Sequence, residues 1–316
     1  MSIKSRKVAI VGTGLVGSSC AYALINQCVC EEVIMIDINK DRAKSEALDL
    51  MHAVEYMSLR TKVRVGSYED CKDVDAVVIT AGPAPKEGQT RLDTLDVSAK
   101  ICKSIVNPIT DSGFNGFFIV ASNPVDIISY YIWKLSGFPK NKVIGTGTAL
   151  DTARLKSIIS EKLGGIDTRS IQAFALGEHG DSQMVPWSRV TVAGESFFKF
   201  TESKKKFTEE ELEGIVEETA KAGWEIINGK GSTYYGIGST VVGILKSIFH
   251  DEKKVIPVST LIEGEYEVKD IYMGVPSIIG KDGVERIIEL EMEENEKKKL
   301  KNSENVIKEY ISKLKY

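Results

Sequence analysis

The sequence of 316 residues has no apolar run approaching 18 residues and no surplus of positive charge. A membrane-spanning helix needs about 20 predominantly apolar residues, so we expect no transmembrane segment and no membrane partner. The 41 Lys and Arg residues are outnumbered by 45 Asp and Glu residues, which gives a net charge of −4. Because a general nucleic-acid-binding protein carries a basic surplus, this balance argues against a nucleic-acid partner.

Cysteine is also scarce and shows no metal-binding spacing. The five cysteines form an odd set without a CxxC pair: Cys20, Cys28, Cys30, Cys71 and Cys102. This pattern favours a reduced, cytoplasmic protein without a cysteine metal site, and we predict no metal. The first residues, MSIKSRKVAIVGTG, enter a strand pattern directly and do not have the layout of a signal peptide.

The residues that are present predict a folded α/β protein. Hydrophobic residues make up 42% and charged residues 27% of the chain, which is ordinary for a globular protein. In the first half, short β-branched runs alternate with helical patterns, which predicts βαβ units and a mainly parallel sheet. The expected strands are 7–11, 32–37, 62–65, 76–80, 117–120 and 142–144, with helices at 15–27 and 40–56.

The second half has a different pattern, typical of an α+β arrangement. Expected strands are 171–176, 189–193, 255–261 and 270–279, and the last two have the spacing of an antiparallel hairpin. A long helix is expected to begin at Thr208, with Glu211 completing a capping box, and a terminal helix from about Asn295. We place a domain boundary near Gly145, giving a nucleotide-binding domain at 1–145 and a catalytic domain at 146–316.

A glycine-rich turn predicts a dinucleotide site. Gly12, Gly14 and Gly17 form a GxGxxG motif between a strand and a helix, and Asp37 ends the second strand 20 residues after Gly17. The chemistry requires a tight turn, a backbone without Cβ beside the pyrophosphate, and a helix N-terminus that faces negative charge. An acid at the position of Asp37 accepts hydrogen bonds from ribose hydroxyls and repels a 2′-phosphate, which favours NAD over NADP.

Polar residues at the ends of other elements are candidates for catalysis. Asp151 and Arg154 are spaced i, i+3 at the start of a helix, so a carboxylate and a guanidinium share one face. Thr148 and Asp151 also have the spacing of a capping box, and taken alone this pattern favours helix capping. His179 lies between Gly177 and Gly180 at the end of a strand run, which suits acid–base chemistry better than core packing.

Two further segments follow apolar strands. Asn123 precedes Pro124, so it either caps a helix or directs its amide at a substrate oxygen. The loop AGPAPKEGQTR ends in Arg91, which is either a solvated cation or a group that loop closure delivers to the site. This loop is expected at the carboxyl edge of the sheet, where open α/β sheets bind ligands.

Together these motifs resemble the lactate/malate dehydrogenase superfamily, and most closely bacterial L-lactate dehydrogenases. The resemblance covers nearly the whole chain, in the family's order: VGTGLVG, TAGPAPKEGQTRLD, ASNPVD, VIGTGTALDTAR, LGEHGDS and GKGSTYYGIG. It implies a Rossmann-type doubly wound parallel sheet followed by an α+β catalytic domain. It also implies NAD-dependent interconversion of L-lactate and pyruvate by a homotetramer.

The resemblance gives each site residue an expected role. His179 is the proton donor to the keto oxygen, Asp151 its orienting partner, and Arg154 the fork that holds the substrate carboxylate. Arg91 polarises the carbonyl, and Asn123, Thr233 and Pro85 line the substrate site. The expected cofactor-binding residues are Gly12, Gly14, Leu15, Val16, Gly17, Asp37, Ala81, Gly82, Asn123, Thr146 and Ile237.

Two departures from the family pattern affect specificity and regulation. Pro85 occupies the lid position where lactate dehydrogenases usually carry Gln and malate dehydrogenases Arg, and it offers neither a side-chain hydrogen bond nor a charge. Arg169 and Arg189 stand where many bacterial relatives have an Arg and a His that bind a sugar bisphosphate between subunits. Fructose 1,6-bisphosphate or phosphate is therefore an expected effector at this position.

The same residues bear on other possible functions. Malate dehydrogenase activity is disfavoured because Pro85 cannot bind a second carboxylate, whereas an L-2-hydroxyacid dehydrogenase for larger apolar substrates, of the hydroxyisocaproate type, stays open. An NAD-dependent glycosidase would need a Cys/His metal pair, and no cysteine follows Cys102. A non-catalytic protein would have no need of the Asp151, Arg154 and His179 set.

Overall fold

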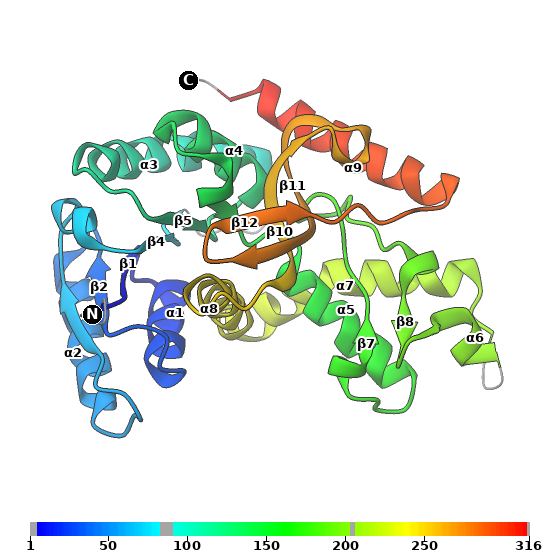
Figure 1. Ribbon diagram of the computed structural model, residues 1–316, viewed down its shortest axis with the longest axis horizontal. Helices are drawn as coiled ribbons and strands as arrows, with labels where there is room; N and C mark the ends of the chain where they lie inside the picture. The colour runs from blue at the N-terminus through cyan, green and yellow to red at the C-terminus, as the bar shows by residue number, and fades with distance from the viewer. Residues whose placement is uncertain (1–4, 83–90, 203–205, 315–316) are drawn as a thin grey trace.

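The computed structural model describes residues 5–82, 91–202 and 206–314, and of residues 91–94 it describes the backbone. In the described part of the first half, strands alternate with α-helices, except between the third and fourth strands, which a 3₁₀ helix joins (Figure 1). The strands are β1 (Lys7–Val11), β2 (Glu32–Ile36), β3 (Lys62–Val65), β4 (Ala76–Ile79), β5 (Phe117–Val120) and β6 (Val143–Gly145). The helices are α1 (Leu15–Asn26), α2 (Lys40–Val54), α3 (Arg91–Asp111) and α4 (Val125–Ser136).

The second half begins with a long helix and contains a small separate sheet. Its helices are α5 (Ala149–Lys162), α6 (Phe197–Glu202), α7 (Glu209–Lys230), α8 (Tyr235–Phe249) and α9 (Glu294–Ser312). Its strands are β7 (Ile171–Gln172), β8 (Thr191–Val192), β9 (Glu195–Ser196), β10 (Lys254–Glu263), β11 (Lys269–Gly280) and β12 (Gly283–Ile287). The short strands β7, β8 and β9 pair antiparallel, beside α6 and α7 (Figure 1).

One large sheet runs through the described molecule in the order β12-β11-β10-β6-β5-β4-β1-β2-β3. The strands from β6 to β3 are parallel, and β10, β11 and β12 extend the sheet antiparallel. The parallel strands are continuous apolar runs because helices cover both faces, and all four residues of β4 are buried. This order confirms the predicted doubly wound α/β fold, with the topological switch between β1 and β4.

The two halves share this sheet. Ser259 of β10 pairs with Gly145 of β6, so a strand from beyond the expected boundary joins the parallel sheet directly. Helix α8 of the second half packs against α1 of the first, and a Cβ at Gly238 would lie only 3.1 Å from the Ser19 carbonyl carbon. The boundary at 145/146 stays a prediction. Within the described residues, no helix combines the length and the apolar character needed to cross a membrane.

Most predicted elements begin and end within a few residues of those observed, but the strand expected at 171–176 is wrong in length. Only Ile171–Gln172 forms β7. Beyond it, Leu176 bridges to Met184 and Gly177 to Gly274, because the chain leaves the small sheet and crosses to β11. Residues 177–182, which we call the His179 loop, follow this crossing.

Candidate active site

At two of its glycines, the turn between β1 and α1 packs so tightly against neighbouring backbone that a side chain would not fit. Gly12 has φ +95°, and a Cβ there would lie 2.7 Å from the Ala81 nitrogen. A Cβ at Gly17 would lie 1.9 Å from the Gly12 carbonyl oxygen. Thr80, which the sequence motif did not single out, donates its hydroxyl hydrogen to the same oxygen at 2.6 Å. These contacts fix the turn at the carboxyl end of β1.

Gly14 differs from the other two glycines because its side-chain position is open. Among the described residues, a Cβ at Gly14 would meet only a guanidinium nitrogen of Arg42, at 4.0 Å. Gly14 is also the N-cap of α1, where helix N–H groups point outward. The open space at a helix N-terminus fits the pyrophosphate of a dinucleotide, which needs close approach to backbone N–H groups.

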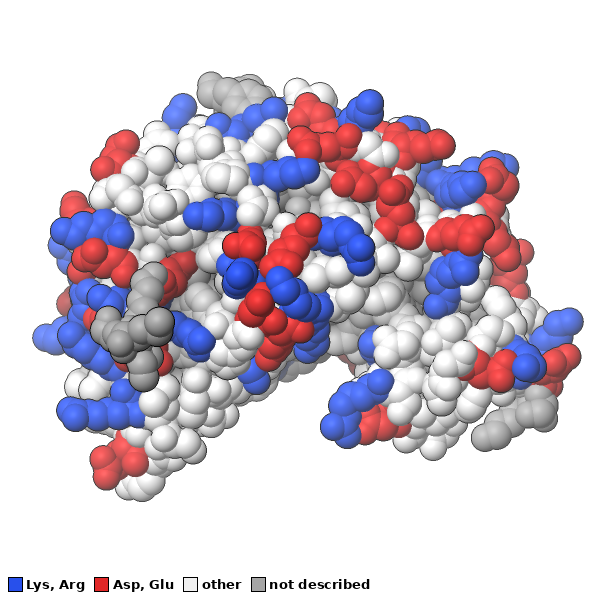
Figure 2. Space-filling view, in the orientation of Figure 1, with Lys and Arg blue, Asp and Glu red and all other residues white. Residues whose placement is uncertain are grey.

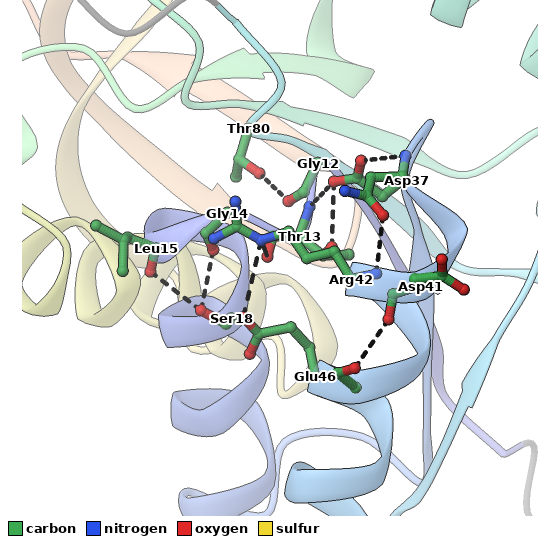
Figure 3. A network of polar contacts seen from close by, with 12 residues as sticks. Gly12, Thr13, Gly14, Leu15, Ser18, Asp37, Asp41, Arg42, Glu46 and Thr80 are labelled. Carbon is green, nitrogen blue, oxygen red and sulfur yellow. Dashed lines mark hydrogen bonds and ion pairs between the residues drawn. The ribbon is translucent and has the colours of Figure 1, made fainter.

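Asp37 lies beside this turn and is prepared to act as a hydrogen-bond acceptor (Figure 3). Its carboxylate accepts hydrogen bonds from the Thr13 nitrogen at 2.6 Å and from the Asn39 nitrogen at 2.9 Å. Burial alone would raise the pKa of Asp37, but these backbone N–H donors outweigh it, so the pKa lies below its ordinary value. The group is therefore an anion at neutral pH, as the predicted contact with ribose hydroxyls requires.

The other predicted cofactor residues lie at the ends of neighbouring elements. Leu15 is half exposed at the start of α1, Val16 follows it, and Ala81 and Gly82 follow β4. Thr146 is buried after β6, and its N–H donates to the Val120 carbonyl. Asn123 is exposed between β5 and α4, and Ile237 is half-buried in the first turn of α8.

The residues expected to carry the reaction come together in the structure. The His179 Nδ1 lies 2.5 Å from Asp151 Oδ2, and Arg154 Nη1 donates to Asp151 Oδ1 at 3.0 Å. The Asp151 side chain is only 2% exposed, whereas that of His179 is 21% exposed and can reach a substrate. Burial would raise the pKa of Asp151, but the charges and hydrogen bonds of His179 and Arg154 hold it below its ordinary value.

The capping interpretation of Thr148 and Asp151 is wrong. The Thr148 hydroxyl donates to the Ala175 carbonyl at 2.6 Å, and no side-chain bond caps α5 at this residue. Asp151 turns instead toward His179 and Arg154. Local spacing favoured a cap, but contacts with the distant 175–179 segment decide both side chains.

Three elements hold the backbone of the His179 loop, through partner residues that no sequence motif singled out. Gly177 and Gly274 of β11 exchange both backbone hydrogen bonds, at 3.0 and 2.9 Å. The Glu178 nitrogen donates to Ser303 Oγ of α9 at 2.7 Å. The His179 nitrogen donates to Asp126 Oδ2 of α4 at 2.8 Å. The loop is thus fixed by its main chain as well as by the Asp151 contact.

The remaining expected substrate residues are only partly described. Thr233 lies in the short connection between α7 and α8. Gly223 of α7 faces Arg154, and a Cβ there would lie 3.3 Å from Arg154 Nη2, so this glycine leaves room for the guanidinium. Arg91 is the first residue of α3, but its side chain and Pro85 lie outside the described part of the chain.

Arg169 and Arg189 are each paired with a carboxylate of their own chain. Arg169 Nη2 lies 2.5 Å from Asp167 Oδ2, and Arg189 Nη2 lies 2.8 Å from Glu291 Oε2. They precede β7 and β8, and the antiparallel register puts them at opposite ends of this strand pair. Within one chain, the structure therefore does not bring the two guanidinium groups together.

Comparison with known proteins decides the family. The lactate/malate dehydrogenase NAD binding domain matches residues 6–145, and the family's alpha/beta C-terminal domain matches residues 148–316. The chain belongs to the lactate/malate dehydrogenase family. It is 55% identical over 317 residues to L-lactate dehydrogenase 3 of Bacillus cereus, covering 100% of both chains. It is 45% identical over 315 residues to L-lactate dehydrogenase 2 of Lactococcus lactis, again covering 100% of both.

Solved structures give the same assignment. The minor L-lactate dehydrogenase of Enterococcus mundtii, in its ligands-bound form, superposes with a TM-score of 0.95 at 43% identity, with 99% of each chain covered. A lactate dehydrogenase from a deep-sea metagenome library gives a TM-score of 0.93 at 43% identity, over 98% of this chain and 99% of the other. The family assignment and the NAD-binding domain predicted from the sequence are thus confirmed.

Proposed function

We propose that the protein is an NAD-dependent L-lactate dehydrogenase that interconverts L-lactate and pyruvate. The observation that carries the proposal is that His179 and Arg154 both contact the buried Asp151. A proton donor and a group that can bind a carboxylate are thereby held side by side. The open cradle at Gly14 and the anionic Asp37 support NAD as the cofactor. Bound NADH supplies the hydride that reduces the keto carbon.

The side chains divide the remaining work. Protonated His179 donates its Nδ1–H to Asp151, which leaves Nε2–H as the proton to be given to the keto oxygen of pyruvate. The Asp151 anion keeps this tautomer and favours the charged imidazole. Arg154 holds the substrate carboxylate with its fork, and Arg91 polarises the carbonyl. In lactate oxidation the same His179 accepts the hydroxyl proton.

Pro85 sets the expected substrate order. A proline ring beside the substrate's third carbon suits a methyl group and gives a second carboxylate no partner. We expect pyruvate to be reduced best, short apolar 2-keto acids next, and oxaloacetate far behind. The apolar homologues should follow pyruvate closely, because one substrate methylene changes the free energy of discrimination by only about 1–3 kcal/mol. Steady-state kcat/KM for pyruvate, oxaloacetate and 2-ketoisocaproate measures this order directly. A preference for 2-ketoisocaproate would indicate the hydroxyisocaproate-type enzyme instead.

The variant Pro85→Arg tests the residue itself. It should raise kcat/KM for oxaloacetate at the expense of pyruvate, because the guanidinium provides the missing charge partner. Pro83→Arg is the matched control, two residues earlier in the same segment, and should leave the ratio near that of the wild type. An unchanged ratio in Pro85→Arg, or a wild type that prefers oxaloacetate, would show that Pro85 does not face the substrate.

The proposal includes a homotetramer with an anion site at Arg169 and Arg189. Because each arginine already has a carboxylate partner, an anion must compete with Asp167 and Glu291 for them. We expect fructose 1,6-bisphosphate or phosphate to tighten assembly or to lower the pyruvate KM. This effect should persist at alkaline pH, because the guanidinium groups stay charged. Light scattering and kinetics at fixed ionic strength, with Arg169→Gln as the variant, measure this. Indifference to both anions would refute the effector site.

A cytoplasmic location completes the proposal. All five cysteines are free thiols, and burial raises the pKa of Cys20, Cys30, Cys71 and Cys102 to about 12. Unpaired thiols are usual in a reducing compartment. On the face shown in Figure 2, acidic and basic side chains lie near one another in the middle and around the rim, with broad uncharged areas between them.

A further inference from the structure

Asp126 is a buried acid next to the active site that the reaction described above does not use. It lies in the first turn of α4 and is only 2% exposed. Its Oδ2 accepts the N–H of His179 at 2.8 Å, and its Oδ1 accepts the hydroxyl of Ser259 from β10 at 2.5 Å. The acid is therefore attached to the main chain of the same residue whose side chain Asp151 holds.

Burying a carboxylate costs free energy unless the charge is paired and hydrogen-bonded. Burial raises the pKa of Asp126 to about 6, although the bonds from Ser259 and His179 and the charge of His179 act to lower it. Above that pH the group is an anion within the fold. The attraction between Asp126 and the imidazolium of His179 is mutual, so an ionised Asp126 also favours the protonated imidazole.

We propose that Asp126 is a positioning residue for the reaction: it holds the backbone of His179 and, as a second negative charge after Asp151, stabilises the protonated imidazole that donates the proton. The inference rests on the proposed function of His179. It gives the enzyme an imidazole that stays charged to higher pH than Asp151 alone would allow, and so extends pyruvate reduction toward alkaline pH.

The surroundings of Asp126 leave its charge available for this role. On the side of α4 that faces β6 and β10, the partner of Asp126 is the uncharged Ser259, and a Cβ at Gly145 would meet Ser259 and Ser129. From α5, Asp151 adds a negative charge, and Arg154 is hydrogen-bonded to that acid. From the His179 loop, Glu178 acts on Asp126 in the opposite sense to His179, because its charge raises the pKa of Asp126.

The first test measures the protonation of His179 without any assay of activity. The protein has three histidines, so ¹³C-labelled imidazole signals can be assigned by replacing His52 and His250. Asp126→Asn keeps an acceptor for the His179 N–H and a donor for Ser259 Oγ, but removes the charge. We expect it to lower the pKa of His179 by on the order of one unit, as loss of a nearby opposite charge usually does.

Glu296→Gln is the matched control. Glu296 is also a buried acid, 6% exposed, and accepts a backbone N–H and a hydroxyl, both from Ser188. It should leave the titration of His179 unchanged. If Asp126→Asn does not fold, Ser259→Ala keeps the proposal testable. Loss of this hydrogen-bond donor should raise the pKa of Asp126, so that less of its negative charge is present while His179 titrates. The pKa of His179 should then fall, as it does in Asp126→Asn.

The second test uses stability. Because the pKa of Asp126 is raised in the folded state, ionisation destabilises the fold as pH rises from about 4 to about 6. Asp126→Asn should therefore match the wild-type Tm near pH 4 and exceed it by a constant amount above pH 6. A more stable variant with a less basic His179 is the expected signature. A Tm that is lower at every pH would indicate a purely structural role and would overturn the proposal.

The third test is the pH profile of kcat/KM for pyruvate. In Asp126→Asn the alkaline limb should move to lower pH while the plateau value changes little, whereas Asp126→Ala, which leaves the His179 N–H without its acceptor, should lose activity at all pH values. Superimposable wild-type and Asp126→Asn titrations of His179 would overturn the inference. If the protein instead lacked pyruvate activity, the proposed function would fail, but the titration would still show whether Asp126 raises the pKa of His179.

Discussion

His179→Asn should lower kcat for pyruvate reduction by about 10²- to 10⁴-fold, the usual contribution of a general acid. Asparagine can still occupy the space beside Asp151 Oδ2 and donate a hydrogen bond to it, but its amide N–H is not acidic enough to protonate the keto oxygen. Because His179 lies after the β7 crossing and the cradle lies at the β1–α1 turn, NADH affinity should change little. Stopped-flow kinetics and fluorescence titration with NADH measure the two quantities separately.

The control for this experiment is His52→Asn. His52 is exposed near the end of α2, and its replacement should leave both turnover and NADH affinity at wild-type values. Near-wild-type pyruvate reduction by His179→Asn would remove His179 from the chemistry, and with it the proposed function. Equal loss of NADH binding and turnover would instead mean that the substitution had disturbed the fold.

Arg154→Leu should raise the pyruvate KM by about 10²- to 10⁴-fold. Two charge-assisted hydrogen bonds to the substrate carboxylate are worth about 1.5–3 kcal/mol each, and each 1.4 kcal/mol is tenfold in affinity. The loss also frees Asp151 of one partner, because Arg154 Nη1 donates to its Oδ1. The pKa of Asp151 should then rise toward its ordinary value.

Arg154→Lys separates charge from geometry. Lysine keeps the positive charge but has no planar fork, so its KM should lie between those of the wild type and Arg154→Leu. The NADH KM should be unchanged in both variants. Equal KM values for lysine and arginine would show that a point charge suffices, and an unchanged pyruvate KM in Arg154→Leu would show that another residue binds the carboxylate.

The parts of the molecule that the sequence predicted well are those with a local cause. The apolar runs of β1 and β4 are buried on both faces of the sheet, and their composition alone indicates this. The GxGxxG turn is partly local, because a Cβ at Gly17 would lie 1.9 Å from the Gly12 carbonyl oxygen within the motif, whereas Gly12 is also restricted by the distant Ala81. The Thr208 and Glu211 capping box forms as predicted, since both partners lie within one turn of α7.

The parts that the sequence did not predict have distant causes. The contact of Asp126 with His179 joins residues 53 apart, and that of Ser259 with Asp126 joins residues 133 apart. No local pattern distinguishes such an acid from an ordinary polar residue in the first turn of a helix. The spacing of Thr148 and Asp151 was misleading for the same reason, because local propensity is a weak guide where tertiary contacts compete.

The hydrogen bond between Glu178 and Ser303 can form only late in the synthesis of the chain. These residues are 125 positions apart, so the ribosome must add the whole intervening chain before Ser303 can support the His179 loop. At 5–20 residues per second, this takes roughly 6–25 s. The nucleotide cradle is translated well before this interval begins. A growing chain therefore passes through a period in which His179 and its partners Asp126 and Asp151 have been made but the support from Ser303 is still missing, and translation speed sets how long that period lasts.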